Sequence, residues 1–468
     1  MAAAGHISSE FNRLRDASWL STGYTLGLCA AQPMYGKLSD IYGRKPILLL
    51  SYLLFAVGCI MSGLGIHMWV VILGRAVSGM GGAGIMTMSS IIITDIVPKR
   101  EVATWRAYVN IAMTLGRSLG GPLGGWLSDT IGWRWSFILQ APFLALAAVL
   151  VIVKLNVGGK THSKENKLAK VDFLGTALLG SSIVATTTVL DQGGKSFPWS
   201  SWWTVLLASN GVLLLIAFVL VEAYVAGEPI FNLRILRRTN VSMAYIIGAL
   251  QIAAQLGMMF SVPLYFQVTQ RASTTAAGAH LIPAVIGNTL GGLLAGTLIR
   301  RTGQFKVLLV VAGLVAGISY LLLYLFWDGH SGFWESLFIL PGGFGTGIAS
   351  ASSFIAMSAM LPAEEIAMAT AGYMLIVGFS ITAGVTASNS VLGMGFQRQL
   401  RLNIHGPGSE KLIQRAMADT NYIAHLSGHL REIVVTCYVS GLKHTYLVSL
   451  GCSLLASFGG LFIARHQI

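Results

Sequence analysis

The sequence predicts an all-α membrane protein, on the strength of its composition and its apolar runs. Of the 468 residues, 54% are hydrophobic and only 10% are charged, whereas soluble domains carry roughly 25% charged residues. The mean hydropathy is +0.69. Mostly apolar runs of about 18 residues or more, the length needed to cross a bilayer, recur along the chain. Open sheets cannot satisfy their backbone in lipid, so these runs are predicted to be helices.

Thirteen membrane crossings are predicted, which places the two termini on opposite faces of the membrane. Residues 1–16 contain Glu10, Arg13, Arg15 and Asp16 and no apolar core, so they predict a luminal or external segment and not a cleavable signal peptide. The crossings are centred near residues 26, 56, 81, 115, 143, 181, 212, 253, 287, 316, 347, 381 and 454.

Basic residues predict the orientation. If residues 36–46 are cytosolic, most Lys and Arg of the short loops fall on that same side, as the positive-inside rule requires. The opposite short loops hold little beyond Arg134, Lys195 and Arg271. The net charge of +13 is therefore interpreted as a sign of topology, and no nucleic acid partner is expected. The predicted cytosolic basic residues include Lys99, Arg100, Lys154, Lys160, Lys164, Lys167, Lys170, Arg234, Arg237, Arg238, Arg300, Arg301 and Lys306.

Residues 36–46 form a short charged turn bounded by glycines, between the first two crossings. Its glycines allow a tight turn and a close approach of two helices. Asp40 is expected to accept hydrogen bonds from the N-terminal amides of a facing helix, and Arg44 and Lys45 are expected to anchor the turn in the cytosol.

An internal repeat predicts two pseudo-symmetric helical halves. Gly36 and Gly43 recur as Gly296 and Gly303, 260 residues downstream and just before Lys306. Parallel repeats of a helical bundle are typical of secondary transporters. A second block recurs at an offset of 263 and comprises Gly79, Gly82, Gly84, Ile85, Ser89 and Ser90, matched by Gly342, Gly345, Gly347, Ile348, Ser352 and Ser353. The predicted cytosolic gate comprises Gly36, Asp40, Gly43, Arg44, Lys45, Gly296 and Gly303.

Two arginines are the only charges predicted near the middle of a crossing. Arg75 requires a polar partner there, because an arginine inside a span costs about 2.5–3.5 kcal/mol on insertion scales. Arg117 is either a functional group or a structural donor to backbone carbonyls. No Asp or Glu lies at the middle of a crossing, although a site for a basic solute should offer a carboxylate.

Several of these motifs resemble those of the major facilitator superfamily. The turn at 36–46 resembles its signature loop, residues 73–79 resemble its fourth-helix motif, and residues 116–125 resemble the fifth-helix motif of its antiporters. The blocks Asp172-Phe173-Leu174-Gly175, Gly193-Gly194 with Trp199, and Glu228-Pro229-Ile230-Phe231 resemble the inserted helix pair of the fourteen-span drug:proton antiporter branch.

Within that branch, four further blocks are similar to those of fungal vacuolar basic amino-acid transporters. They are Ser9-Glu10-Phe11 through Trp19, Gln32-Pro33, Gly132-Trp133-Arg134-Trp135, and Ala277-Gly278-Ala279-His280-Leu281-Ile282-Pro283. The resemblance also implies that a helix preceding Ser9 is absent, as in a truncated gene model or splice form.

The resemblance implies a proton-coupled antiporter of small solutes that works by alternating access. The expected substrates are basic amino acids carried into the vacuole; multidrug export at the plasma membrane and a truncated, non-transporting membrane protein are the alternatives. Arg75 is the expected proton-coupling residue. The protein is expected to be a monomer in the lipid bilayer. The expected antiporter motif, in which small residues permit close helix contact, comprises Gly116, Arg117, Gly120, Gly121, Pro122, Gly124 and Gly125.

The resemblance and the repeat together predict the domain organisation. An N-terminal half at 17–154, lacking its first helix, is followed by a cytosolic linker at 155–171 and the inserted helix pair at 172–224. A C-terminal half at 225–466 then carries a long luminal or external loop at 397–442.

No enzyme active site, cofactor or metal site is predicted, because no catalytic or nucleotide-binding motif and no metal-ligand spacing occurs in the sequence. Polar side chains within the crossings are interpreted either as interhelical hydrogen-bonding groups or as the lining of a substrate cavity. These possible cavity-lining residues are Tyr24, Gln32, Asn110, Gln140, Gln251, Gln255 and Asn288.

Overall fold

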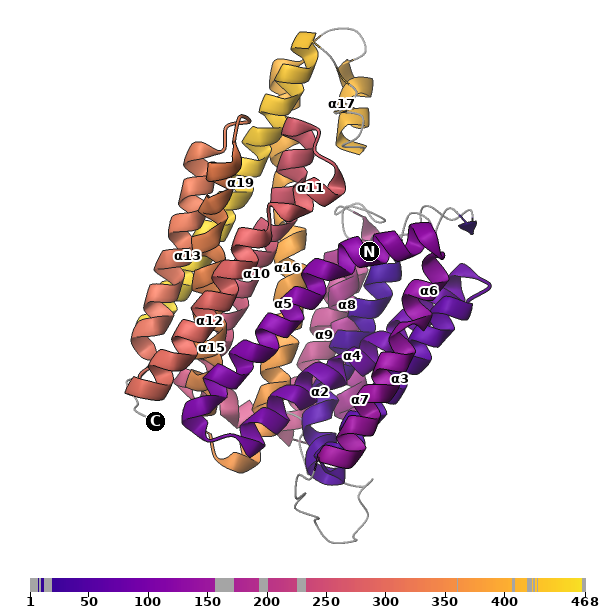
Figure 1. Ribbon diagram of the computed structural model, residues 1–468, viewed down its shortest axis with the longest axis vertical. Helices are drawn as coiled ribbons and strands as arrows, with labels where there is room; N and C mark the ends of the chain where they lie inside the picture. Colours follow the sequence, from indigo (N-terminus) through magenta and orange to yellow (C-terminus); the bar gives the residue numbers. More distant parts are fainter. Residues whose placement is uncertain are drawn as a thin grey trace. The chain divides into compact units, whose positions relative to one another are not determined.

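The fold was analysed in a computed structural model of the chain. The structure describes residues 7, 10–11, 19–155, 172–192, 201–224, 233–359, 361–405, 409–418, 423, 426 and 428–464. All regular elements in these residues are helices (Figure 1). The predicted linker at 155–171 lies outside the described residues from residue 156 on, as do the resemblance blocks at 193–199 and 228–231.

The described helices have the following bounds. They are α2 (Trp19–Tyr42), α3 (Arg44–Leu64), α4 (Met68–Ile96), α5 (Lys99–Thr130), α6 (Trp133–Ile138), α7 (Gln140–Lys154), α8 (Phe173–Gln192), α9 (Trp202–Tyr224), η3 (Leu233–Arg237), α10 (Thr239–Gln270), α11 (Thr274–Ala279), α12 (Ile282–Thr302), α13 (Lys306–Phe326), α14 (Phe333–Ser336), η4 (Leu337–Ile339), α15 (Leu340–Ser358), α16 (Ala363–Asn403), α17 (Ser409–Ala418) and α19 (Gly428–Leu461).

A helix lies at each of the thirteen predicted crossing centres. Ten spans among the described residues are long and apolar enough to cross a membrane. The helices α2 and α5 are of similar length but are less apolar, and the apolar part of α8 covers only Leu174–Leu190. These findings confirm the predicted fold class of an all-α membrane protein.

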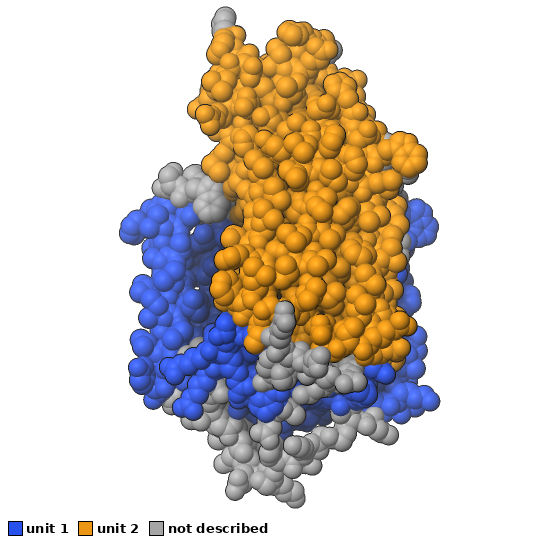
Figure 2. Space-filling model, turned by 90° about the vertical axis from the view of Figure 1, so that its left-hand side faces the viewer, with its two compact units in different colours: residues 1–102, 115–242, 357–379 blue, residues 103–114, 243–356, 380–468 orange. Residues whose placement is uncertain are grey.

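The described chain divides into two compact units, and each contains a segment from the other predicted half (Figure 2). Unit 1 comprises Met1–Val102, Leu115–Ser242 and Met357–Phe379. Unit 2 comprises Ala103–Thr114, Met243–Ala356 and Ser380–Ile468. The helices α5 and α16 therefore each contribute to both units, which a division at the predicted half boundaries did not anticipate.

The internal repeat is visible in the close contacts of glycines with backbone carbonyls. In each repeat, two helices approach so closely that a Cβ on a glycine would overlap a carbonyl oxygen of the other helix. These contacts are Gly27 with Ala76 O, Gly287 with Leu340 O, Gly79 with Tyr24 O and Gly343 with Ala284 O, at 2.0, 2.2, 2.1 and 2.0 Å from such a Cβ. The shift from α2 to α12 is thus 260 residues, as predicted, but that from α4 to α15 is 264, because packing aligns Gly79 with Gly343 and not with Gly342.

The turn predicted at 36–46 is shorter in the structure. Helix α2 continues to Tyr42 and α3 begins at Arg44, so Gly43 alone connects them, with φ at 92°. Gly303 connects α12 to the segment before α13 with φ at 68°. Both glycines have left-handed backbone conformations that disfavour a residue with a Cβ. Gly36, in contrast, is a helical residue and takes no part in the turn.

The long loop predicted at 397–442 is also largely helical. Helix α16 extends to Asn403, α17 covers Ser409–Ala418, and α19 begins at Gly428. Ile413 and Ala416 of α17 are buried in the same apolar cluster as Leu400 and Val434. Polar residues can continue a helix beyond a membrane crossing when one of its faces is packed in this way, so the charged residues there did not indicate where the helices end.

Candidate functional site

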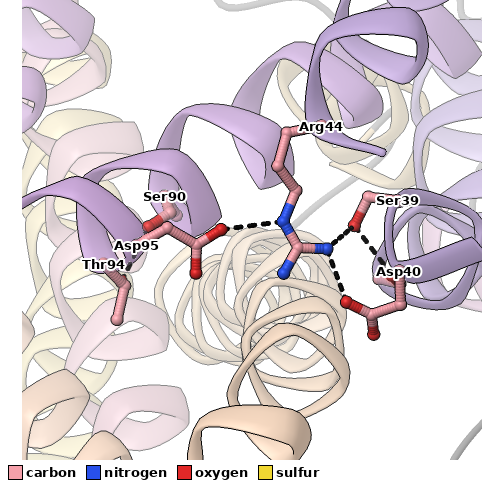
Figure 3. Close-up of polar contacts among 7 residues, drawn as sticks. Ser39, Asp40, Arg44, Ser90, Thr94 and Asp95 are labelled. Atoms are coloured by element: carbon pink, nitrogen blue, oxygen red, sulfur yellow. Dashed lines mark hydrogen bonds and ion pairs between the residues drawn. The ribbon is translucent and has the colours of Figure 1, made fainter. Parts of the chain in front are cut away.

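Arg44 joins the ends of three helices of unit 1 (Figure 3). Its Nε donates to Asp95 Oδ2 over 2.7 Å, and its Nη1 donates to Ser39 Oγ over 2.9 Å and to Asp40 Oδ1 over 2.5 Å. The Arg44 side chain is 15% exposed and that of Asp95 is 29% exposed. The planar guanidinium presents its donors in fixed directions, so it holds these acceptors in one arrangement. Residues 39, 40, 44 and 95 are called the Arg44 network below.

One member of this network has a different partner from the one expected, and the pairing of another was not expected. Asp40 was expected to accept from helix amides, but in the structure its hydrogen bond comes from Arg44, one turn further along the chain. Asp95, at the end of α4, is the second carboxylate on this guanidinium. It lies 51 residues away along the sequence, and no local pattern indicated the pairing.

Lys45, which is predicted to belong to the cytosolic gate, binds the end of a helix. Its Nζ donates to Ile152 O near the end of α7, over 2.7 Å. In the second repeat, Lys306 Nζ donates to Leu461 O at the end of α19, also over 2.7 Å. Carbonyls in the last turn of a helix lack intrahelical partners and favour a cation. These lysines fasten the first residues of α3 and α13 to the ends of α7 and α19.

Gly36 and Gly296 mark two equivalent close helix contacts. In unit 1, a Cβ on Gly36 of α2 would lie 2.9 Å from Ala367 O and 3.2 Å from Met368 Cα of α16. In unit 2, a Cβ on Gly296 of α12 would lie 2.8 Å from Thr104 Cα of α5. Each contact thus joins a helix of one repeat to a helix of the other, on glycines that the sequence analysis had paired.

Arg75 lies nearer one end of its helix than predicted. It is the eighth residue of α4, about 10 Å along the axis from the first. Its Nε donates to Leu20 O over 3.3 Å. The centre of its guanidinium lies 4.5 Å from the ring centroid of Tyr24 and 5.5 Å from that of Phe137. Aromatic faces attract a cation without supplying a negative charge.

The predicted antiporter motif lies on α5, and three of its glycines have no close neighbour among the described atoms. Among the described atoms, none lies within 4 Å of a Cβ built on Gly116, Gly120 or Gly124. The side chains of Arg117, Gly121, Pro122 and Gly125 lie outside the description, although their backbone belongs to α5. A role for this motif remains a prediction.

Three of the possible cavity-lining residues bind one another in unit 2. Asn110 Nδ2 donates to Asn288 Oδ1 over 2.5 Å, and Asn288 Nδ2 donates to Gln255 Oε1 over 3.5 Å. This links α5, α12 and α10 and favours interhelical hydrogen bonding. Gln251 similarly donates to Ser453 Oγ. In unit 1, Tyr24 lies beside Arg75, Gln32 is buried, and Gln140 donates to Ser136 O.

Helices α8 and α9, which are predicted to be an inserted pair, bring together polar groups that lie far apart in the sequence. Gln192 at the end of α8 donates to Thr22 of α2 over 2.5 Å, and both side chains are buried. A Cβ on Gly175 would lie 2.2 Å from Asp172 Oδ2 and 3.1 Å from Glu222 Oε2, so two carboxylates border one small space. Glu222 is buried near the end of α9.

Two sequence blocks used for the resemblance meet in unit 1. Glu10 Oε2 accepts from Trp133 Nε1 over 2.6 Å, and Glu10 Oε1 accepts from Arg134 Nη1 over 2.7 Å. Phe11 packs edge-on against the Trp133 ring. The hydrogen bonds from Trp133 and then Arg134 lower the pKa of Glu10 from its ordinary value, because they favour its charged form. The contact holds the N-terminal segment against α6.

This contact is expected to depend on pH. A carboxylate with a lowered folded-state pKa stabilises the fold above its ordinary pKa of about 4.3, and this contribution is lost as the pH falls through the lowered value. Because the pair is half exposed, Glu10→Gln should reduce the stability at pH 7 by less than about 1 kcal/mol. Thermal inactivation midpoints of the two proteins should differ at pH 7 and converge in acid. A difference that persists unchanged at pH 3 would contradict the assignment.

The family model for the Major Facilitator Superfamily matches residues 1–385. The chain is 31% identical to the vacuolar membrane amino acid uptake transporter fnx2 of Schizosaccharomyces pombe, over 99% of this chain and 80% of that protein. It is 32% identical to the multidrug resistance protein fnx1 of the same organism, over 94% of this chain and 84% of that protein. It is 26% identical to the vacuolar basic amino acid transporter 2 of Saccharomyces cerevisiae, over 94% of this chain and 96% of that protein.

Among solved structures, the chain resembles the proton:xylose symporter XylE. The TM-score is 0.59 at 14% identity, over 100% of this chain and 92% of that one. At this identity the likeness concerns the fold alone.

Proposed function

Because this chain belongs to the Major Facilitator Superfamily, it is a membrane transporter of small molecules and not an enzyme, and we propose that it carries basic amino acids into the fungal vacuole in exchange for protons. The similarity to two vacuolar amino acid transporters over nearly the whole chain is the observation that carries this proposal. The protein acts as a monomer, and its two helical halves give access to the two sides of the membrane in turn.

The Arg44 network and the two glycine contacts are proposed to form the cytosolic gate. Gly36 and Gly296 allow α2 to meet α16 and α12 to meet α5 at backbone distance. The Arg44 network holds the ends of α2, α3 and α4 in one arrangement beside the first of these contacts. Opening and closing of the gate on one side of the membrane is the step that an alternating-access cycle requires.

Multidrug export is the second candidate function, and the similarity to the multidrug resistance protein favours it. No Asp or Glu lies near the middle of a predicted crossing, so no carboxylate is placed there to bind the side chain of lysine. A binding site made of aromatic and neutral polar side chains suits a drug-like cation at least as well as lysine. The two functions differ in their substrates and share the fold and the gate.

Transport by the purified protein in sealed vesicles tests the proposal. With an imposed pH gradient, labelled lysine, arginine or histidine should accumulate, and a protonophore should abolish the accumulation. Accumulation of drug-like cations in place of amino acids would favour the second candidate. If neither class of solute moves in response to the gradient, both candidate functions are overturned.

A further inference from the structure

Arg75 is a cation without an anionic partner among the described residues. Its Nε donor is used by Leu20 O. Its electrostatic neighbours are Tyr24 and Cys59, both ordinarily neutral. A guanidinium carries five N–H donors, and the four on Nη1 and Nη2 have no acceptor among the described residues. The rest of its charge-assisted hydrogen-bonding capacity is therefore available to a group that is not part of the described chain.

The surroundings of Arg75 orient it without neutralising it. Tyr24 of α2 and Phe137 of α6 place aromatic rings beside the guanidinium. Cys59 of α3 is a neutral neighbour of Arg75, and its Sγ contacts Gln140 Oε1 of α7 over 3.8 Å. Aromatic contacts fix the plane of a guanidinium and leave its edge available. The edge with Nη1 and Nη2 matches the two oxygens of a carboxylate, which binds such a fork through two parallel hydrogen bonds.

The chemistry of arginine also limits what Arg75 does in transport. A guanidinium stays protonated in proteins, so Arg75 cannot itself release and take up the transported proton. Its permanent charge instead favours the binding of a mobile anion, because an arginine within a membrane span is energetically costly until its charge is compensated. A free amino acid carries such an anion, its α-carboxylate.

From this geometry we infer that Arg75 binds the α-carboxylate of the amino acid substrate. The inference rests on the proposed function and names the part of the substrate that is recognised. Carboxylate binding at Arg75 separates amino acids from amines and drug-like cations that have the same side-chain charge but no carboxylate. Arg75 is then a specificity-determining residue, and its part in proton coupling is indirect.

The test measures the exchange of lysine across the membrane without a proton gradient, so that the result does not depend on proton coupling. Vesicles containing the full-length protein are loaded with unlabelled lysine, and entry of labelled lysine is measured against increasing external lysine or cadaverine, which is lysine without its carboxylate. Wild type should prefer lysine. Arg75→Ala should raise the half-saturating lysine concentration about 10- to 100-fold, the range for losing a hydrogen-bonded charge pair, and leave the half-inhibitory cadaverine concentration unchanged.

Further variants separate this role from a structural one. Arg75→Lys keeps the charge but not the fork, so it should retain part of the preference for lysine. Arg301→Ala, which removes an exposed arginine at the end of α12, should behave as wild type. Two results would overturn carboxylate binding at Arg75 without overturning amino acid transport. One is that Arg75→Ala weakens the binding of lysine and of cadaverine equally, and the other is that wild type binds both with equal affinity. A wild type that exchanges neither lysine, arginine nor histidine would overturn both.

Discussion

Arg44→Ala is expected to stop most transport while the protein still folds and reaches the membrane. The substitution removes all three hydrogen bonds that Arg44 makes to Ser39, Asp40 and Asp95, at a guanidinium that is largely shielded from water. Charge-assisted hydrogen bonds of this kind contribute about 1.5–3 kcal/mol. If one gate conformation loses about 2 kcal/mol of stability, the ratio of its population to that of the other conformation falls about 30-fold. The protein would then remain in the conformation in which the Arg44 network is not formed.

Initial rates of amino acid uptake, normalised to the amount of folded protein in the membrane, measure this effect. Asp95→Asn should cause a smaller loss, because Arg44 keeps Asp40 and Ser39. Arg301→Ala is the control, since it removes the same charge from an exposed position in the last turn of α12. Full transport by Arg44→Ala, or equal losses in both arginine variants, would remove the network from the gate.

Gly36→Ala and Gly296→Ala are each expected to reduce transport strongly. The new methyl carbon would lie 2.9 Å from Ala367 O in the first case and 2.8 Å from Thr104 Cα in the second. Backbone atoms cannot move aside as a flexible side chain can, so the helices must separate. Overpacking of this kind costs about 1–3 kcal/mol, and the cost falls on the conformation in which these helices touch.

Gly393→Ala provides the control for both glycine variants. Gly393 lies on α16, and no described atom lies within 4 Å of a Cβ at this position, so its transport rate should match that of wild type. The double variant Gly36→Ala, Gly296→Ala should be slower than either single one if both contacts belong to one gate. Normal transport by both single variants would show that the close approach is not needed in the cycle.

The crossings could be predicted from sequence because lipid imposes a simple demand. Every backbone group in the bilayer must bond within its own segment, so a long apolar run has to be a helix. The repeat could be predicted for a related reason. A glycine is needed where two helix backbones come into contact, as they do at Gly36 and at Gly296. Helix ends beyond the bilayer were harder to predict. The helices within 397–442 depend on the packing of residues such as Ile413 into an apolar cluster. A single apolar residue in a polar stretch of sequence does not predict such packing.

The site was predictable as a set of residues but not as a set of partners. Arg44 and Asp40 stood out because they lie in a short charged turn that is bounded by glycines and placed between two apolar runs. Their partner Asp95 and the aromatic rings beside Arg75 come from other helices, and sequence separation says nothing about such contacts. Lys45 shows the same limit, because the sequence indicated a basic residue at a membrane surface and the structure showed the helix end that it binds.

The sequence by itself therefore determined that this protein is a helical membrane transporter built from two repeats, because apolar length and glycine spacing are local properties of the chain. Only the tertiary structure decided which charges meet, which glycines face another backbone, and that Arg75 has no anionic partner among the described residues. Those properties depend on how helices rotate and pack against one another. The offset between α4 and α15 is 263 residues in the sequence comparison and 264 in the structure. A shift of one residue along a helix changes which side chain faces the neighbouring helix.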